Sequence, residues 1–100
     1  MTKADLVKNI SSETGIARKD VAIIVDAFLN EIKQAIKEGN HIELRQFGTF
    51  NLRVRQARVG RNPRTNQTVP VPERVVPTFK YSREFKIDIL NNVKVDRIKK

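Results

Sequence analysis

The sequence predicts an α+β fold: two helices at the start, a small antiparallel sheet drawn out into a long β-hairpin, and a short helix near the end. Three observations support this fold class. Apolar residues recur at spacings of three and four before residue 40, as in amphipathic helices. Alternating and β-branched residues are typical of strands between residues 41 and 80. Within that stretch, Arg55 to Thr68 contains four arginines and no acidic residue, with only Ala57 and Val59 as apolar groups.

The first helix is predicted to run from about Lys3 to Thr14. Thr2 can cap its N-terminus, and Asp5 lies where a capping box places a carboxylate. Gly15 then supplies a C-terminal stop.

The second helix, from about Arg18 to Glu38, is the strongest prediction, because its apolar residues keep helical spacing over five turns. They are Val21, Ile24, Val25, Phe28, Leu29, Ile32, Ala35 and Ile36. The first helix offers too few apolar partners to cover this face. We therefore expect part of it to be buried against a second copy of the chain, as in a helical bundle shared by two protomers.

Strands are predicted at His41 to Arg45 and at Thr49 to Val59, and the β-branched run from Val69 to Phe79 leads into a returning strand at Val75 to Lys80. The prolines of the last strand are tolerated only on an edge or at a bulge. Phe47, Phe50 and Phe79 should form an aromatic cluster around the sheet. A final helix, from about Arg83 to Asn92, can be capped by Ser82, and residues 93–100 are expected to be a frayed basic tail.

The charge of the chain, formally +9, is unevenly distributed. Residues 1–44 carry six basic and seven acidic groups, whereas residues 45–80 carry eight basic groups against Glu73 alone. A basic half on a near-neutral half predicts a phosphate-binding surface on a scaffold. No cysteine is present, so neither a disulfide nor a thiolate metal site is expected. No apolar run resembles a signal peptide or a membrane span, which predicts a soluble cytoplasmic protein with no membrane partner.

The segment around residues 55–64 predicts an arm that binds a polyanion. Its arginines recur every three residues, which on a continuous strand would place successive guanidinium groups on opposite faces. Arginine also enters a narrow minor groove more readily than lysine does. The tip, Asn62-Pro63, has two interpretations. It can be a simple turn, or Pro63 can be a stiff apolar wedge inserted between base pairs.

The chain resembles the bacterial HU and integration host factor family over about residues 2–90. The resemblance rests on Phe47-Gly48-Thr49-Phe50, on Gly60-Arg61-Asn62-Pro63-Arg64-Thr65 and on Val76-Pro77-Thr78-Phe79-Lys80. It implies an intertwined homodimer or a heterodimer with a paralogue, two β-arms that embrace double-stranded DNA, and intercalation of Pro63, as minor-groove benders do.

The resemblance also implies which residues act. The DNA contacts would be Lys3, Arg53, Arg55, Arg58, Arg61, Asn62, Pro63, Arg64, Thr65, Arg74, Lys80, Arg83 and Lys86. The dimer core would contain Phe28, Leu29, Ile32, Ile36, Leu44, Phe47, Phe50 and Phe79. No cofactor, metal or small-molecule substrate is implied, and the protein would be located in the nucleoid.

Four departures from the usual family pattern are visible in this sequence. Ala17 stands where a serine usually caps the second helix, so that helix start would depend on Thr14 or fray. Gln46 and Asn66 stand at positions usually held by glycine, and Tyr81-Ser82 replaces Pro-Gly.

Other functions remain as alternatives. An enzyme is disfavoured, because there is one histidine and no pair of acids with a neighbouring base. An RNA-binding or ribosome-associated protein would need exposed aromatic residues for unstacked bases. A pure assembly module leaves the arginines without a purpose. Within DNA binding, the arm has few residues for reading base edges, which favours binding with little sequence specificity over site-specific bending. The domain prediction is a single unit, residues 1–92, with a helical dimerisation part (1–40), a sheet and arm (41–80) and a C-terminal helix (83–92).

Overall fold

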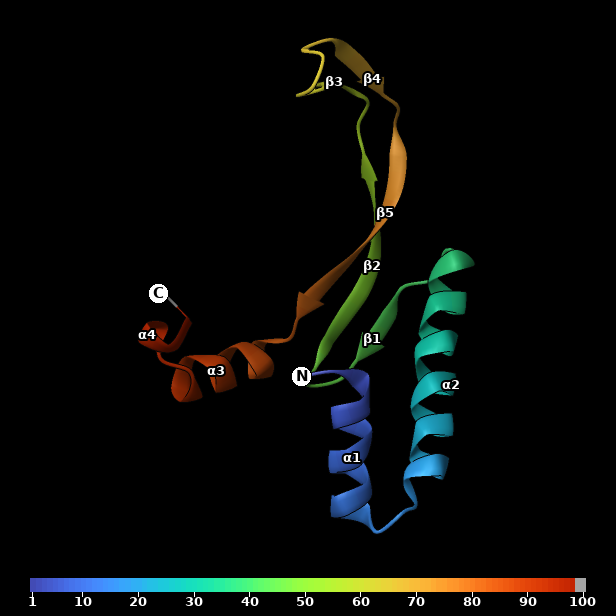
Figure 1. The fold of residues 1–100 in the computed structure, drawn as a ribbon, viewed down its shortest axis with the longest axis vertical. Coiled ribbons are helices and arrows are strands. Elements are labelled where there is room, and N and C mark those ends of the chain that lie inside the picture. Colours follow the sequence, from blue (N-terminus) through green and yellow to red (C-terminus); the bar gives the residue numbers. More distant parts are fainter. Residues whose placement is uncertain (99–100) are drawn as a thin grey trace. The chain divides into compact units, whose positions relative to one another are not determined.

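The computed structural model describes residues 1–98 and contains two compact units. The first is Met1–Glu38, and the second begins at Gly39. This boundary lies close to the predicted border between the helical part and the sheet. The prediction that residues 1–92 act as a single domain stays a prediction. Figure 1 shows the helices of the first unit and the strands and C-terminal helices of the second.

The first unit is a hairpin of two helices, α1 (Lys3–Thr14) and α2 (Arg18–Lys37). The predicted capping box is present: the Thr2 hydroxyl accepts from the Asp5 amide, and the Asp5 carboxylate accepts from the Thr2 amide at 2.8 Å. Gly15 ends α1 in the left-handed region at φ 77°. The two helices contact each other, and each contributes one buried valine, Val7 and Val21.

Helix α2 begins without a side-chain cap. Ala17 accepts hydrogen bonds only through its carbonyl oxygen, from the amides of Asp20 and Val21 at 3.0 Å each. Thr14 does not substitute for the missing cap, because its hydroxyl donates to the Ile10 carbonyl and accepts from the Ile16 amide. The expectation that Thr14 could cap α2 is therefore wrong. The amides of the first turn of α2 have no side-chain acceptor at the N-cap position.

The second unit contains an antiparallel sheet of β1 (Ile42–Leu44), β2 (Gly48–Arg55) and β5 (Arg74–Tyr81), in the order β1-β2-β5. Strand β5 is an edge strand, which explains why Pro77 is tolerated within it. Backbone and aromatic ring approach closely at Gly48: a Cβ there would lie 2.5 Å from Cζ of Phe79. The site accepts only glycine without rearrangement.

The connection from β1 to β2 is a tight turn. Gln46 adopts φ +66°, and the Phe47 amide donates to the Leu44 carbonyl at 3.0 Å. Strand β1 consequently ends at Leu44, one residue before the predicted end. Glycine is the residue best suited to this φ. Gln46 therefore replaces the usual glycine at a position where the backbone is in the left-handed region.

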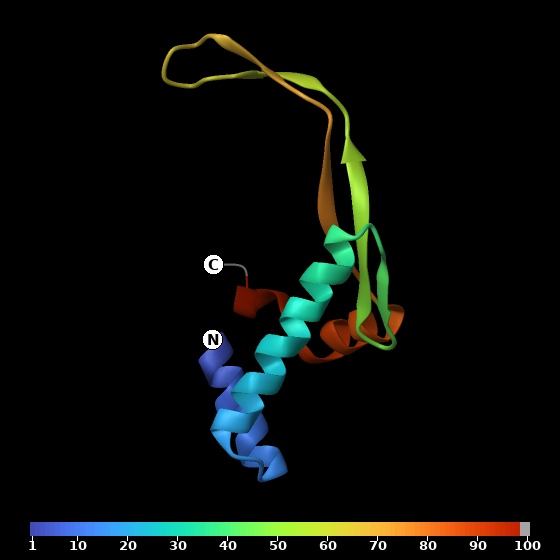
Figure 2. The ribbon, with the colours of Figure 1, turned by 90° about the vertical axis from the view of Figure 1, so that its right-hand side faces the viewer.

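The arm is a second, separate sheet. Strands β3 (Arg58–Arg61) and β4 (Thr68–Val71) pair antiparallel with each other, and Figure 2 shows the two strands of the ribbon side by side up to the turn. The predicted strand Thr49 to Val59 and the β-branched run Val69 to Phe79 are not continuous, whereas the returning strand predicted at Val75 to Lys80 is confirmed within β5. Both strands are interrupted, at residues 56–57 and at residues 72–73. Pro72 has no amide hydrogen to donate to a ladder, which accounts for the interruption on its strand.

The predicted last helix is confirmed as α3 (Arg83–Asn92), with the Ser82 hydroxyl accepting from the Phe85 amide at 3.1 Å. The tail differs from the prediction. Val93 is extended, and a further helical turn, α4 (Val95–Ile98), follows it. The frayed tail was inferred from its terminal position and its basic charge, which overlooked the apolar residues between the cations. Lys99 and Lys100 lie outside the described residues. None of the helices within residues 1–98 is both long enough and apolar enough to span a bilayer.

The predicted aromatic cluster is present and has one more member. The ring centroids of Phe50 and Phe79 are 4.9 Å apart, and those of Phe47 and Phe79 are 5.3 Å apart. Phe85 of α3 joins the cluster, with its centroid 5.5 Å from that of Phe47. The Ser82 amide also donates to the Phe47 carbonyl at 2.9 Å. These contacts attach α3 to the sheet.

Candidate nucleic-acid interface

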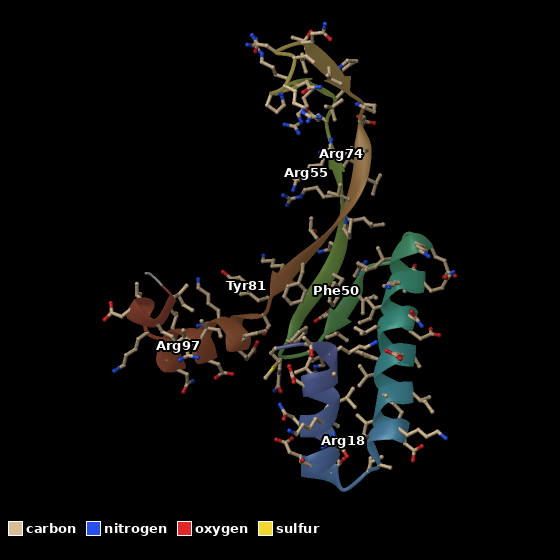
Figure 3. All side chains as sticks on the ribbon, in the orientation of Figure 1. Arg18, Phe50, Arg55, Arg74, Tyr81 and Arg97 are labelled. Atoms are coloured by element: carbon tan, nitrogen blue, oxygen red, sulfur yellow. The ribbon has the colours of Figure 1, made fainter. Side chains whose placement is uncertain are left out.

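The arm arginines have no acidic partners in the described structure. Arg55, Arg58, Arg61 and Arg64 are all exposed. Across residues 1–98, the only contact of 4.0 Å or less between a cationic nitrogen and a carboxylate oxygen is that of Lys3 with Asp26, at 2.6 Å. Figure 3 shows the side chains of the arm extending outward from the ribbon. The positive charge of the arm is therefore available to an external anion.

Like charges meet at the outer end of the central ladder. Arg55 of β2 is paired in register with Arg74 of β5, and both are labelled in Figure 3. Directly opposed residues of an antiparallel pair share one face of the sheet, and like charges in that position destabilise it. A phosphate group close to both guanidinium groups would reverse the sign of this interaction.

The two arginines of β3 lie on opposite faces of the ribbon, because three residues separate them on a strand of period two. This agrees with the prediction for Arg58 and Arg61. The prediction does not extend to the other two arginines. Arg55 lies beyond the interruption, and Arg64 lies in the turn at the tip, where strand alternation does not apply.

The tip is a closed turn organised by Asn62. Its side-chain oxygen accepts from the Arg64 amide at 2.9 Å, and its backbone carbonyl accepts from the Asn66 amide at 2.7 Å. The Asn62 amide donates to the Gln67 carbonyl at 2.9 Å, which closes the turn across the ribbon. Pro63, next in the chain, is exposed. Both interpretations of the tip thus have support, because Asn62 forms the turn while Pro63 is left at its surface.

Arg61 also contributes to this turn. Its Nη1 donates to the Asn66 Oδ1 at 3.2 Å, and Asn66 has φ +58°. Asparagine is among the residues that tolerate the left-handed region best, so the absence of the usual glycine does not prevent the turn. A contact between a guanidinium and an amide leaves the full charge of Arg61 in place.

Three further cations surround an open hollow of about 870 Å³ at the other end of the sheet. They are Arg45 at the end of β1, Lys80 of β5 and Arg83 of α3. Lys80 and Arg83 were predicted as contacts, whereas Arg45 was not assigned a role. Its position follows from the turn at Gln46, which the sequence did not define. Glu43 and Glu84 also line the hollow, so it is less positive than the arm.

The remaining predicted DNA contacts lie outside the arm sheet and the hollow. Lys3 is paired with Asp26, and Lys86 lies beside an apolar hollow lined by Phe79, Phe85 and Leu90. Arg53 and Thr65 are exposed. No described contact tests the role of any of these residues.

The apolar residues predicted for a dimer core are incompletely covered in the single chain. Phe28 is 51% exposed, Phe47 45%, Leu29 42% and Phe79 42%. Ile32, Ile36, Leu44 and Phe50 are partly buried. Within the described residues, the apolar side chains in the buried class are Val7 and Val21, both in the first unit. The chain therefore carries a large apolar surface that it does not itself bury.

Comparison with known proteins decides the family. Residues 1–90 match the family model described as "Bacterial DNA-binding protein". The chain belongs to the bacterial DNA-binding protein family. The resemblance to HU and integration host factor predicted from the sequence is thereby confirmed.

Named members of the bacterial DNA-binding protein family are similar over nearly the whole chain. The chain is 38% identical over 91 residues to integration host factor subunit alpha from Aliivibrio fischeri, covering 91% of this chain and 93% of that protein. It is 37% identical over 86 residues to the DNA-binding protein HU of Clostridium pasteurianum, covering 86% and 94% respectively.

The fold is also shared with solved family members. An HU–DNA cocrystal structure from Anabaena superposes with a TM-score of 0.85 at 32% identity, covering 89% of this chain and 97% of that one. The solution structure of a mutant of transcription factor 1 covers 100% of both chains, with a TM-score of 0.63 at 26% identity. The predicted α+β class, with a sheet drawn out into an arm and a short C-terminal helix, is confirmed.

Proposed function

We propose that this protein is an architectural DNA-binding protein that acts as a dimer, inserts its two arms into the minor groove and bends the duplex by intercalating Pro63. The observation that carries the proposal is an arm of exposed arginines without acidic partners in the described structure, ending in an exposed proline. Family membership and the likeness to an HU–DNA cocrystal structure support DNA as the polyanion.

The dimer is supported by the small buried core of each unit. A two-helix hairpin with one buried valine per helix has little core of its own. In the second unit, the phenylalanine cluster leaves Phe47 and Phe79 nearly half exposed. Burying an aromatic side chain contributes about 1.5–3 kcal/mol, so a second copy that covers these faces gains substantial stability. We propose a homodimer, with a paralogue of the same family as the alternative partner.

The minor groove is the proposed site for the arm because of its side-chain chemistry. Guanidinium groups suit the enhanced negative potential of a narrow minor groove. A two-stranded ribbon with cations on both faces, as at Arg58 and Arg61, can contact the phosphates on either side of that groove. Val59 is 73% exposed and Val69 45% exposed, so the ribbon also carries apolar groups suited to the sugar edges.

Bending is proposed to come from the tip. Minor-groove benders insert an apolar wedge between base steps, at a cost of a few kcal/mol of stacking, which the wider contact of the bent duplex offsets. Pro63 is apolar, stiff and exposed on a turn that Asn62 holds closed. Its ring can enter the stack without first being uncovered.

Binding with little sequence specificity, and a role in organising the nucleoid, fit this set of contacts best. The arginines supply positive charge for the phosphates, and the proline is proposed to deform the duplex. The arm offers few groups that read base edges. Site-specific bending is the second candidate, since a relative 38% identical is named as an integration host factor subunit. It would require discrimination of 10³-fold or more between sites.

The test is a titration of the protein against a random duplex, a pre-bent duplex and a structured RNA, each at two salt concentrations. The proposal predicts the tightest binding to the pre-bent duplex, weaker binding to the random duplex, and the weakest binding to RNA. Affinity should fall by about 0.9 log units per log unit of salt for each phosphate neutralised. Preference for RNA would contradict the proposal, and strong preference for one duplex sequence would favour the site-specific alternative.

A further inference from the structure

The chain extends beyond the family match, which ends at residue 90, and the extension has an unexpected pattern. Valine and isoleucine alternate with charged residues: Val93, Val95 and Ile98 with Lys94, Asp96 and Arg97. In the turn α4, Val95 and Ile98 are three residues apart and therefore share one side. Lys94 and Arg97 each precede one of these residues in the chain, and both cations are exposed. The extension is amphipathic, whereas a segment used only to bind phosphate has no need of apolar residues.

Apolar residues of the extension continue an apolar surface of α3. A hollow of about 450 Å³ is lined by residues of both helices, including Ile89, Leu90, Val95 and Ile98. Ile89 and Leu90 also line the neighbouring hollow of about 340 Å³, which begins at Phe79 on the sheet. The two hollows together form one strip, named here the C-terminal strip. Beyond the sheet, its apolar members are Phe85, Ile89 and Leu90 of α3, Val93 after α3, and Val95 and Ile98 of α4.

The C-terminal strip is strongly exposed at its outer end. Leu90 is 71% exposed, Val95 70% and Ile98 73%. An isolated helical turn of four residues is not stable in water, since a helix of this length lies far below the size at which its hydrogen bonds offset nucleation. A helical α4 therefore needs a surface against which to pack.

We infer that the C-terminal strip is covered by a second copy of this chain, so that the extension fastens the dimer rather than binding DNA. The inference rests on the proposed dimer, because the strip begins at Phe79, a residue that the dimer is proposed to bury. The extension adjoins that surface through Ile89 and Leu90, which line both hollows. Charged residues flank the strip, as Lys86, Lys94 and Arg97 do, which matches the polar rim of a protein interface.

The experiment compares two double variants of the full chain. The first, Val95→Asn with Ile98→Asn, removes the apolar side of α4. The second, Lys94→Gln with Arg97→Gln, removes the cations of the same segment and leaves its apolar side intact. For each variant, sedimentation equilibrium gives the dimer dissociation constant, thermal unfolding is followed at several protein concentrations, and DNA titrations give the salt dependence. The fluorescence of Tyr81, the single tyrosine of a chain without tryptophan, reports on the adjoining hollow.

The inference predicts a dimer dissociation constant roughly 100-fold higher for the apolar double variant, since each copy buries two side chains in the interface. The charge double variant should stay within about threefold of the wild type, with an unchanged salt slope of DNA binding. An unchanged dissociation constant for the apolar variant overturns the inference. A loss of stability for the apolar variant that is the same at every protein concentration also overturns it, because the strip would then pack against its own chain. A shallower salt slope of DNA binding for the charge variant overturns it as well, because the extension would then bind DNA.

Failure of this inference is separable from failure of the proposed function. A wild-type protein that is dimeric and bends DNA, with a dissociation constant insensitive to Val95 and Ile98, refutes only the role of the extension. A wild-type protein that is monomeric at the concentrations at which it binds DNA refutes the proposed dimer, and the inference with it.

Discussion

Arg55 and Arg74 lie directly opposite each other at the outermost rung of the β2–β5 ladder, two cations sharing one face of the sheet where the arm begins. No carboxylate lies within 4.0 Å of either guanidinium in the described part of the chain. The free protein thus carries a repulsion at this point which bound phosphate would relieve. If DNA binds here as proposed, this pair should lower the stability of the free protein and raise its affinity for DNA.

Replacing Arg74 by glutamine should therefore stabilise the free protein and weaken DNA binding. We expect the free energy of unfolding to rise by about 0.5 kcal/mol per protomer at low salt, as for removal of a like-charge cross-strand pair. The matched control is Arg53→Gln, because Arg53 faces Val76 and removing its charge relieves no such pair. Equal stability changes in the two variants, measured by denaturant unfolding, would contradict the argument.

Replacing Pro63 by alanine should reduce DNA bending more than it reduces affinity. Loss of the wedge removes the kink, but it also removes the cost of unstacking, so the two effects on affinity partly cancel. Cyclisation of short duplexes measures bending, and titration measures affinity. The control is Pro70→Ala, since Pro70 lies within β4, opposite Val59 and away from the tip. If Pro63→Ala lowered bending and affinity in equal proportion, intercalation would lose its support.

Replacing Arg58 by alanine should weaken binding to all duplexes alike. Each phosphate contact contributes about 0.9 to the slope of log affinity against log salt, so loss of one contact on both arms makes the slope shallower by about 1.8. Lys33→Ala, a charge change on α2, serves as the control. A loss of affinity confined to one duplex sequence would instead assign Arg58 to base readout.

Replacing Ala17 by serine should stabilise the protein. The N-cap position of α2 has no side-chain acceptor and its backbone is extended (φ −58°, ψ 141°), which suits a capping serine. We expect a gain of about 1 kcal/mol in the free energy of unfolding, measured at fixed protein concentration because the dimer is linked to folding. Ala22→Ser, inside the same helix, should show no gain. A gain of the same size there would mean that capping is not the cause.

The elements with a strong periodic signal were predictable from sequence. Helix α2 follows its apolar spacing, and α1 follows its capping box and Gly15, because these signals act within a few residues. Family resemblance gave the positions of Gln46 and Asn66, where the structure has positive φ. Asparagine tolerates a positive φ, so the turn at Asn66 was expected, but the sequence did not define the turn at Gln46.

Features that depend on contacts between distant residues were not predictable. The pairing of Lys3 with Asp26 joins two helices, and the addition of Phe85 to the phenylalanine cluster depends on how α3 meets the sheet. The interruption of the arm reflects paired positions on both strands, of which only Pro72 gives a sequence signal. The turn α4 was not predicted, because the basic charge of the tail was considered and the apolar residues between the cations were not.

The turn that Asn62 closes has a consequence for the kinetics and entropy of recognition. Its backbone amide, its backbone carbonyl and its side-chain oxygen each form a hydrogen bond within the turn. If Pro63 intercalates as proposed, a tip held by these hydrogen bonds should give up little conformational freedom on binding, so preorganisation would lower the free-energy cost. The proposed binding would then be limited by how readily the duplex opens, and it would favour flexible base steps.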